Sequence, residues 1–177
     1  MKKLLLIHLL AFLILVPFSS CIKNPPPFAI VKITVVDGNS WTSSNTTMNL
    51  VSGATVKLYN TQTEIINNAA PAYTATTDQA GNAVIPVAYK SIYFFTVEKG
   101  NAKNVINGFL IIGIFQTQAE IQSSAFQIPF PTIGSPKFND TNGDGKIDAS
   151  DKIYADYIDL IQGQIVSKTS IIYQTGL

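Results

Sequence analysis

Residues 140–151 read D-T-N-G-D-G-K-I-D-A-S-D, a spacing of oxygen-bearing side chains that suits a hard metal cation. Ca²⁺ takes about six to eight oxygen ligands, and a twelve-residue loop supplies them from positions one, three, five, seven, nine and twelve. Those positions hold Asp140, Asn142, Asp144, Lys146, Asp148 and Asp151, where Lys146 would offer only its backbone carbonyl. The spacing therefore predicts a Ca²⁺ site, and the alternative is an Asp/Asn/Gly-rich turn without a metal.

Two further positions of the loop support this interpretation. Gly145 stands sixth, where the chain of such a loop must turn sharply, and Ile147 stands eighth. An apolar side chain at the eighth position can anchor the loop to the body of the protein. Both are expected of an EF-hand-like loop.

The segments on either side of the loop decide what kind of calcium module it could be. Pro129, Pro131 and Pro136 exclude a helix that runs into the loop, so a paired EF-hand is not predicted. Beyond the loop, Ser150 is a suitable N-cap for a helix that would end at Gly163. Its apolar positions at helical spacing are Ile153, Tyr157, Leu160 and Ile161.

We therefore expect a calcium loop with one short exit helix over residues 137–163. Residues 164–177 would form a C-terminal strand or a tail. Loop and exit helix together resemble a single dockerin repeat. Dockerins carry two such repeats, and one is present here, so cohesin binding does not follow from the resemblance.

The N-terminus has the pattern of an export signal. Lys2 and Lys3 precede an apolar run at residues 4–16, which is too short to span a bilayer stably. A small residue before Cys21, the only cysteine, resembles the bacterial lipoprotein signal, in which the cysteine is acylated and becomes the first residue. We predict a signal peptide at residues 1–20, lipidation at Cys21 and a short tether at residues 21–27. The alternative is an ordinary secretory leader with an incidental cysteine.

Composition and charge limit the class of protein. Hydrophobic residues make up 46% and charged residues 13% of the 177 residues, which is typical of a globular domain. All 12 basic residues are lysines, and removing Lys2 and Lys3 leaves 10 of them against 11 acidic residues. A net side-chain charge of 10 − 11 = −1, without arginine, argues against a nucleic-acid partner.

The middle of the chain alternates between apolar and polar residues in short runs with turn residues between them. This pattern predicts an antiparallel β-sandwich over residues 28–136. The expected strands are 28–36, 54–59, 73–77, 83–87, 92–98, 105–115 and 120–128, of which 105–115 would be central and buried. The expected inward faces are Ala29, Val31, Ile33 and Val35, then Ala54, Val56 and Leu58, and then Tyr93, Phe95 and Val97.

Three of these segments resemble a known family. They read G-A-T-V-K-L-Y at 53–59, T-D-Q-A-G-N-A at 77–83 and Y-F-F-T-V-E-K-G at 93–100. These motifs resemble the carboxypeptidase regulatory-like, or transthyretin-like, sandwich, and with the leader the whole resembles envelope lipoproteins of the Bacteroidetes type. The resemblance implies a mainly β, transthyretin/prealbumin-like fold, an accessory or adhesive role and no active site. The residue after the cysteine is Ile22 and not aspartate, which resembles the pattern of lipoproteins that are sent on to the outer membrane.

The sequence does not favour an enzyme. The only histidine, His8, would leave with the leader, and no nucleophile or phosphate-binding motif is present. We predict a lipid-anchored, calcium-binding envelope protein that acts as a non-catalytic binding or adhesion module. Its partners would be the membrane, through the anchor, and a protein or glycan ligand. Trp41, in a polar loop, would either contact such a ligand or fold back onto the sandwich.

The alternative function is a structural subunit of a surface assembly. Such subunits assemble by adding a strand to a sheet edge, or resemble pilin domains that weld a lysine to an asparagine through an isopeptide bond. Lys32 and Glu98, with Asn104 or Asn107, are the residues that could form such a weld. Lys32 and Glu98 are both expected to be solvated, which disfavours it.

Overall fold

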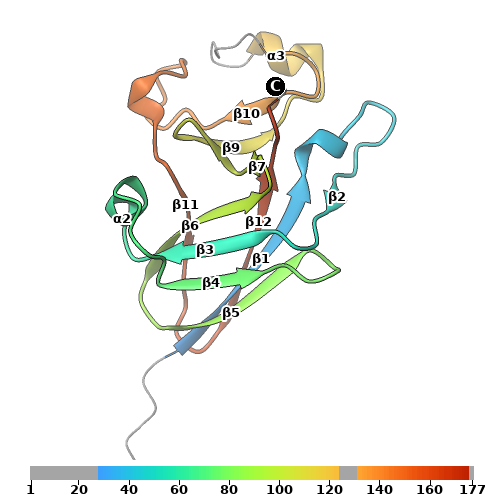
Figure 1. The fold of residues 1–177 in the computed structure, drawn as a ribbon. Helices are drawn as coiled ribbons and strands as arrows, with labels where there is room; N and C mark the ends of the chain where they lie inside the picture. The colour runs from blue at the N-terminus through green and yellow to red at the C-terminus, as the bar shows by residue number, and fades with distance from the viewer. Residues whose placement is uncertain (1–27, 124–130, 176–177) are drawn as a thin grey trace, which may run out of the picture.

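The structure is a computed structural model that describes residues 28–123 and 131–175. Two β-sheets pack face to face, and a third, smaller sheet lies at the upper end in Figure 1. The predicted signal peptide, Cys21 and the tether at residues 21–27 lie outside the described residues. The β-sandwich predicted from the sequence is confirmed.

The first sheet is built around its longest strand, β1 (Phe28–Asp37). On one side β1 pairs in parallel with β12 (Ile165–Ile172). On the other side it pairs antiparallel with β5 (Asn82–Ala88) and, at its end, with β2 (Asn49–Leu50). Residues 164–173 therefore return to the sheet as a strand. Because β12 starts at the same end of the molecule as β1, this pair is parallel, and the sheet is not antiparallel throughout as expected.

The second sheet has the order β11-β6-β3-β4, with β7 paired to the end of β6. All of these pairs are antiparallel. The strands are β3 (Thr55–Tyr59), β4 (Tyr73–Thr76), β6 (Ile92–Lys99), β7 (Ala102–Lys103) and β11 (Asp156–Asp159).

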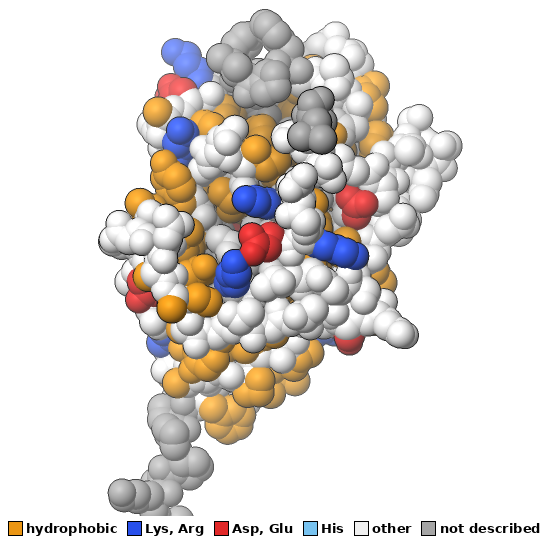
Figure 2. Space-filling model, viewed as in Figure 1, with side chains coloured by type: hydrophobic (Ala, Val, Ile, Leu, Met, Phe, Trp, Pro, Cys, Tyr) orange, Lys and Arg blue, Asp and Glu red, His pale blue; other side chains and the backbone are white. Residues whose placement is uncertain are grey.

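The core between the two sheets consists of the side chains that the alternation pattern predicts. Every second residue of β1, β3 and β6 is buried, because successive side chains of a strand point to opposite faces. The confirmed inward residues are Ala29, Val31, Ile33, Val35, Ala54, Val56, Leu58, Tyr93, Phe95 and Val97. Hydrophobic side chains also reach the surface at the lower end of the molecule (Figure 2).

The third sheet replaces the long central strand that was expected at residues 105–115. The chain instead forms β8 (Val105–Ile106) and β9 (Phe109–Ile114), joined by Asn107 and Gly108. Both joining residues have positive φ angles, 53° and 91°, as a two-residue hairpin turn requires. The prediction of one long strand at residues 105–115 is therefore wrong, because this Asn-Gly turn divides the stretch into two paired strands. β10 (Pro136–Phe138) pairs with the other edge of β9.

Helical structure is confined to short pieces in the described residues. They are α2 (Gln62–Ile66), capped by Thr61, and α3 (Gln118–Ser123), together with the 3₁₀ turns η1 (Gly38–Ser40) and η2 (Ala149–Asp151). No helix in this part of the chain is long and apolar enough to cross a membrane. The strand predicted at 120–128 is wrong where it is described, because α3 occupies its first residues. Its remainder falls outside the described residues.

The exit helix predicted after the calcium loop is also wrong. The loop ends in the single turn η2, whose N-cap is Asp148 and not Ser150, and no helix continues from it. Tyr154 then takes a positive φ of 56°, which ends any helix, and the N–H groups of Ile153 and Tyr154 both donate to the Gly108 carbonyl. The following residues alternate between buried and exposed and form β11. Pairing with β6 therefore prevails over the helical spacing.

Side chains bridge the two open sides of the sandwich. On one side, the Tyr73 hydroxyl of β4 accepts from the Ala88 N–H of β5 (3.0 Å). On the other, Lys168 of β12 is in register with the buried Ile33 and so points inward, where its Nζ contacts the Asp156 Oδ1 of β11 (2.5 Å). The same Nζ donates to the Tyr157 carbonyl (2.8 Å) and lies over the Tyr157 ring. Lys168 therefore joins the two sheets at their edge.

We predict that Lys168→Met lowers the free energy of unfolding by about 1–3 kcal/mol, because it leaves the nearly buried Asp156 carboxylate without its cation. The value is at the lower end for a buried pair since the Lys168 side chain is 35% exposed. Urea unfolding followed by circular dichroism measures it. Lys103→Met, at an exposed lysine of β7, is the control and should change stability by less than about 0.5 kcal/mol. Equal stability of both variants would contradict a bridging role for Lys168.

Candidate functional site

The loop 140–151 follows β10 and ends in η2, at the upper left of Figure 1. The N–H of Asn139, just before it, donates to the Leu110 carbonyl of β9 (3.0 Å). Within the loop, the Ile147 side chain is 6% exposed. The loop is thus tied to the body at its entrance, and the predicted apolar anchor at its eighth position is confirmed.

Asp140, at the first position, organises the turn. Its Oδ1 accepts from the Gly143 N–H (2.7 Å) and its Oδ2 from the Gly145 N–H (2.9 Å). Both glycines have positive φ angles, 71° and 82°, which L-residues with side chains rarely adopt. The sharp turn predicted at Gly145 is confirmed.

Asp151, at the twelfth position, closes the loop from inside. Its side chain is fully buried, and its Oδ1 accepts from the N–H groups of Thr141 (2.8 Å) and Asn142 (3.4 Å). Its Oδ2 accepts from the Asp148 N–H (2.9 Å). None of the ion pairs in the described part of the chain involves Asp151. A buried carboxylate here is stabilised by backbone amides alone.

The three other residues that were predicted to ligate through their side chains form short-range turns. Asn142 accepts from the Asp144 N–H, and its amide nitrogen donates to Asp144 Oδ2 (3.1 Å) and to Ser150 Oγ (2.9 Å). Asp144 accepts from the Lys146 N–H. Asp148 accepts from the Ser150 hydroxyl and N–H, and these hydrogen bonds hold the pKa of the Asp148 carboxyl below its usual value.

In this conformation the acidic side chains do not converge. Residues 28–123 and 131–175 contain no group of three or more His, Cys, Asp or Glu residues with the spacing of a metal site. The donor set nevertheless fits a hard cation, because all its side-chain donors are oxygens. Each carboxylate also offers about four lone-pair sites, so Asp140 and Asp151 can accept amide hydrogen bonds and still ligate an ion. Calcium binding remains a prediction.

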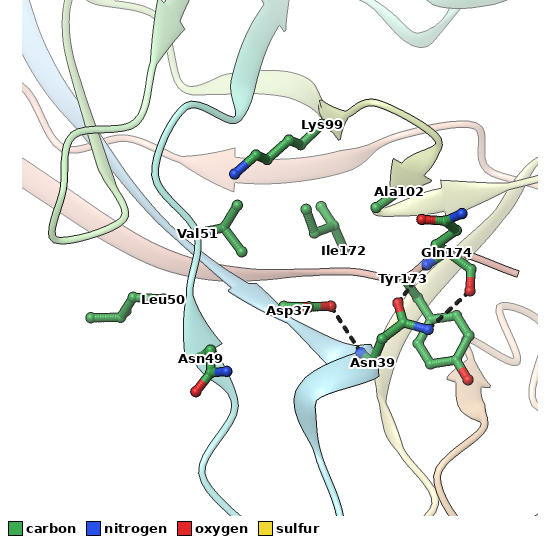
Figure 3. Close-up of a pocket in the computed structure, with 10 residues that line it drawn as sticks. All are labelled: Asp37, Asn39, Asn49, Leu50, Val51, Lys99, Ala102, Ile172, Tyr173 and Gln174. Atoms are coloured by element: carbon green, nitrogen blue, oxygen red, sulfur yellow. Dashed lines mark hydrogen bonds between the residues drawn. The ribbon is translucent and has the colours of Figure 1, made fainter.

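A hollow lies where β1 ends, and sequence reasoning did not find it. It has a volume of ≈ 770 Å³ and is drawn in Figure 3. Four separate segments contribute its lining: Asp37, Asn39, Asn49, Leu50, Val51, Lys99, Ala102, Ile172, Tyr173 and Gln174. No local motif marks such a site, because its residues come from segments of both sheets that are far apart in the sequence.

The polar groups of this hollow are mostly committed to the fold. Asn39 and Gln174 bind each other twice, through Asn39 Nδ2 to the Gln174 carbonyl (2.9 Å) and through the Gln174 N–H to Asn39 Oδ1 (2.7 Å). Lys99 Nζ donates to the Ser52 carbonyl (2.7 Å). Burial and the nearby Asp37 carboxylate raise the pKa of the Tyr173 hydroxyl. We assign these contacts to holding the C-terminus in place.

The structure also decides two alternatives left open by the sequence. Trp41 is 6% exposed, so it folds back onto the body of the protein. The residues for an isopeptide bond are not assembled. Lys32 lies on the outer side of the first sheet, between Val84 and Ser167, whereas Glu98 lies in the second sheet and binds Lys57 (2.5 Å). A weld through Lys32 and Glu98, which the sequence already disfavours, is therefore not assembled in this structure.

Comparison with known proteins shows a distant likeness of fold. No protein-family model and no curated protein matches the chain. Among solved structures, it is similar to a minor pilin of Streptococcus agalactiae (10% identity, 86% of this chain and 47% of that chain, TM-score 0.40). It is also similar to the shaft pilin of Lactobacillus rhamnosus GG (11% identity, 84% of this chain and 50% of that chain, TM-score 0.41). A third similar structure is hydroxyquinol 1,2-dioxygenase from Pseudomonas putida (10% identity, 86% of this chain and 58% of that chain, TM-score 0.38).

The chain spans about half the length of these proteins. Pilins and a dioxygenase are among them, so the likeness concerns the β-sandwich and assigns no activity.

The buried closure of the loop leads to a prediction that does not depend on a metal. In the presence of a chelator, Asp151→Asn should lower the free energy of unfolding by about 1–3 kcal/mol, because an amide nitrogen cannot accept from the buried N–H groups. Asp144→Asn, at an exposed position of the same loop, is the matched control and should change it by less than about 0.5 kcal/mol. Denaturant titrations of both variants measure this. Equal losses would show that Asp151 does not close the loop.

Proposed function

We propose that this chain is an exported, lipid-anchored β-sandwich module of the bacterial cell envelope. It binds calcium through the loop 140–151 and acts in adhesion or surface structure without catalysis. The β-sandwich and the distant likeness to pilin domains are consistent with a surface module. The anchor rests on the sequence around Cys21.

The observation that carries the calcium part of the proposal is the environment of Asp151. A carboxylate that is fully buried and has no ion-pair partner in the described residues is costly unless a cation or several donors compensate its charge. Three backbone amides do so in part, and each draws a ligand-bearing stretch of the loop toward Asp151. A bound cation would complete the compensation.

In the proposed site, Asp140, Asn142, Asp144, Asp148 and Asp151 ligate through side-chain oxygens and Lys146 through its carbonyl. A bound Ca²⁺ would neutralise the mutual repulsion of the carboxylates. The chain's own part is to hold the loop between β10 and η2, so binding would tighten this upper end. Within residues 28–123 and 131–175, no second loop of this kind and no incoming helix accompany it, and we therefore assign a structural role and not that of a sensor.

The absence of catalysis is supported by the chemistry of the side chains. The only histidine and the only cysteine of the chain belong to the leader and its lipidation site. Three of the seven acidic residues outside the loop are engaged in ion pairs: Glu98 with Lys57 (2.5 Å), Glu120 with Lys137 (2.8 Å) and Asp156 with Lys168 (2.5 Å). These pairs lower the pKa of Glu120 and raise that of Lys57. A lowered pKa makes the Glu120 carboxylate a weak general base.

A structural subunit of a surface assembly is the second candidate, and the sheet edges bear on how it would assemble. The inward-pointing Lys168 disfavours another strand at the β11/β12 edge, because adding one would bury its charge. Pro86 lies within β5, at the opposite edge of the first sheet, and has no N–H to donate to an added strand. Assembly through the faces of the sandwich is therefore favoured over strand addition.

We predict that the wild-type protein binds calcium with a Kd on the order of 10⁻⁴–10⁻³ M, as extracellular modules do. At about 1 mM calcium this adds about 0.4–1.4 kcal/mol to the free energy of unfolding. Asp144→Asn should abolish both effects, because it removes a charged ligand. Asp159→Asn, at an exposed aspartate of β11, should leave both unchanged. Titration calorimetry without heat of binding in the wild type would refute the site.

The anchor is tested separately, in cells. Cys21→Ser should release the protein from the membrane fraction and abolish the incorporation of a fatty-acid analogue, since no other cysteine is available for acylation. Asp144→Asn serves as the control and should be retained and labelled normally. Unchanged membrane retention of Cys21→Ser would show that the cysteine is incidental.

A further inference from the structure

Exposed apolar side chains gather on the outer face of the first sheet, at the end where β1 begins. Phe28 is 53% exposed, Ile161 55%, Ile165 62% and Val84 55%. Single exposed apolar residues are ordinary, but several at one end of a sheet form a continuous surface that calls for a partner.

Backbone contacts show that these residues are neighbours. The Gly163 N–H donates to the Phe28 carbonyl (2.8 Å), which brings the turn after Ile161 to the start of β1. Ile30 is in register with Ile165 on one side and with Pro86 on the other. We define the basal patch by these side chains: Phe28, Ile30, Val84, Pro86, Ile161 and Ile165.

The charges around the basal patch suit an anionic surface. Lys32 follows Ile30 on the outer face of β1 and is the only charged residue at the outward positions of β1, β5 and β12 in the described chain. The acidic loop 140–151 lies at the opposite end of the molecule (Figure 1). A lysine beside apolar side chains is an arrangement found on protein surfaces that contact anionic lipids.

The position of the chain's start relates the patch to a membrane. The segment that leads to Phe28 contains Cys21, with only residues 22–27 between them. Six residues reach at most about 20 Å when fully extended. An acyl chain on Cys21 would therefore keep the sandwich close to the bilayer, with the end that carries the basal patch nearest to the lipid.

We propose that the basal patch docks on the bilayer surface to which Cys21 is anchored. The docking rests on the lipid anchor of the proposed function and adds to it a fixed orientation. The apolar side chains enter the headgroup region, Lys32 faces anionic headgroups, and the loop 140–151 points away from the membrane.

The test uses the acylated protein in vesicles of phosphatidylethanolamine and phosphatidylglycerol. A nitroxide is attached to one introduced cysteine, either I165C in the basal patch or the control I112C on β9. Ile112 is 55% exposed, similar to the patch residues, but lies in the third sheet at the other end. Because Cys21 is acylated, it carries no thiol for the label. We expect the accessibility ratio of oxygen to a water-soluble nickel complex to be severalfold higher at position 165 than at 112.

Each other outcome overturns the docking in a different way. Equal ratios at both positions, with the protein bound to the vesicles, would reject docking and leave the anchor intact. Protein that is not acylated and does not sediment with vesicles would reject the anchor itself. A shielded label at position 165 in the unacylated Cys21→Ser protein, with a dimer in analytical ultracentrifugation, would assign the patch to a second copy. If mass spectrometry finds that residues 1–20 are retained, the basal patch would be assigned to contact with the leader.

Discussion

The whole arrangement depends on β1 being paired on both sides while its inner face is fully buried. Ala29, Val31, Ile33 and Val35 have no exposed surface. A shift of one residue in register would therefore place the polar Lys32 and Thr34 in the core. That constraint fixes β5 on one side and β12 on the other. Through β12 it carries the C-terminus across the full length of the sheet, and it places the turn at Gly163 against the first residue of β1. The two ends of the molecule are therefore defined by one strand.

The closing of the sandwich by polar side chains follows from the same constraint. A position of β12 in register with Ile33 must point inward, yet it holds Lys168. Its long apolar stem can cover the Phe95 ring while the ammonium group reaches Asp156 at the edge. An inward lysine on an edge strand opposes the addition of another strand. The same pair thus stabilises the contact between the sheets and keeps this edge from templating association.

The sequence predicted the parts of the fold that depend on local alternation, and it failed where pairing between distant segments decides. The inner faces of β1, β3 and β6 were correct because burial on one face imposes a period of two. The apolar stretch at 105–115 does not form the single strand that its composition predicts, because the Asn107-Gly108 turn divides it into β8 and β9. Residues 153–161 fit helical spacing as well as strand alternation, and only the pairing of Ile158 with Tyr93 and its neighbours on β6 selects the strand. Within the loop, Gly145 and Ile147 were predictable because a sharp turn and an anchor are local needs, whereas the burial of Asp151 is a tertiary effect.

The loop 140–151 and the basal patch lie at opposite ends of the molecule, and this separation suits the membrane docking that we propose. Carboxylates near an anionic bilayer would repel it, and exposed apolar side chains at a distal surface would promote association. Here the acidic residues follow β10, beyond the third sheet, while the apolar residues surround the start of β1. The chain achieves this by crossing the molecule twice after residue 151. β11 carries it back along the second sheet to the lower end, and β12 returns it beside β1. An ion pair between Lys168 and Asp156 joins β12 to β11. Two hydrogen bonds between Asn39 and Gln174 fix the chain just after β12 ends.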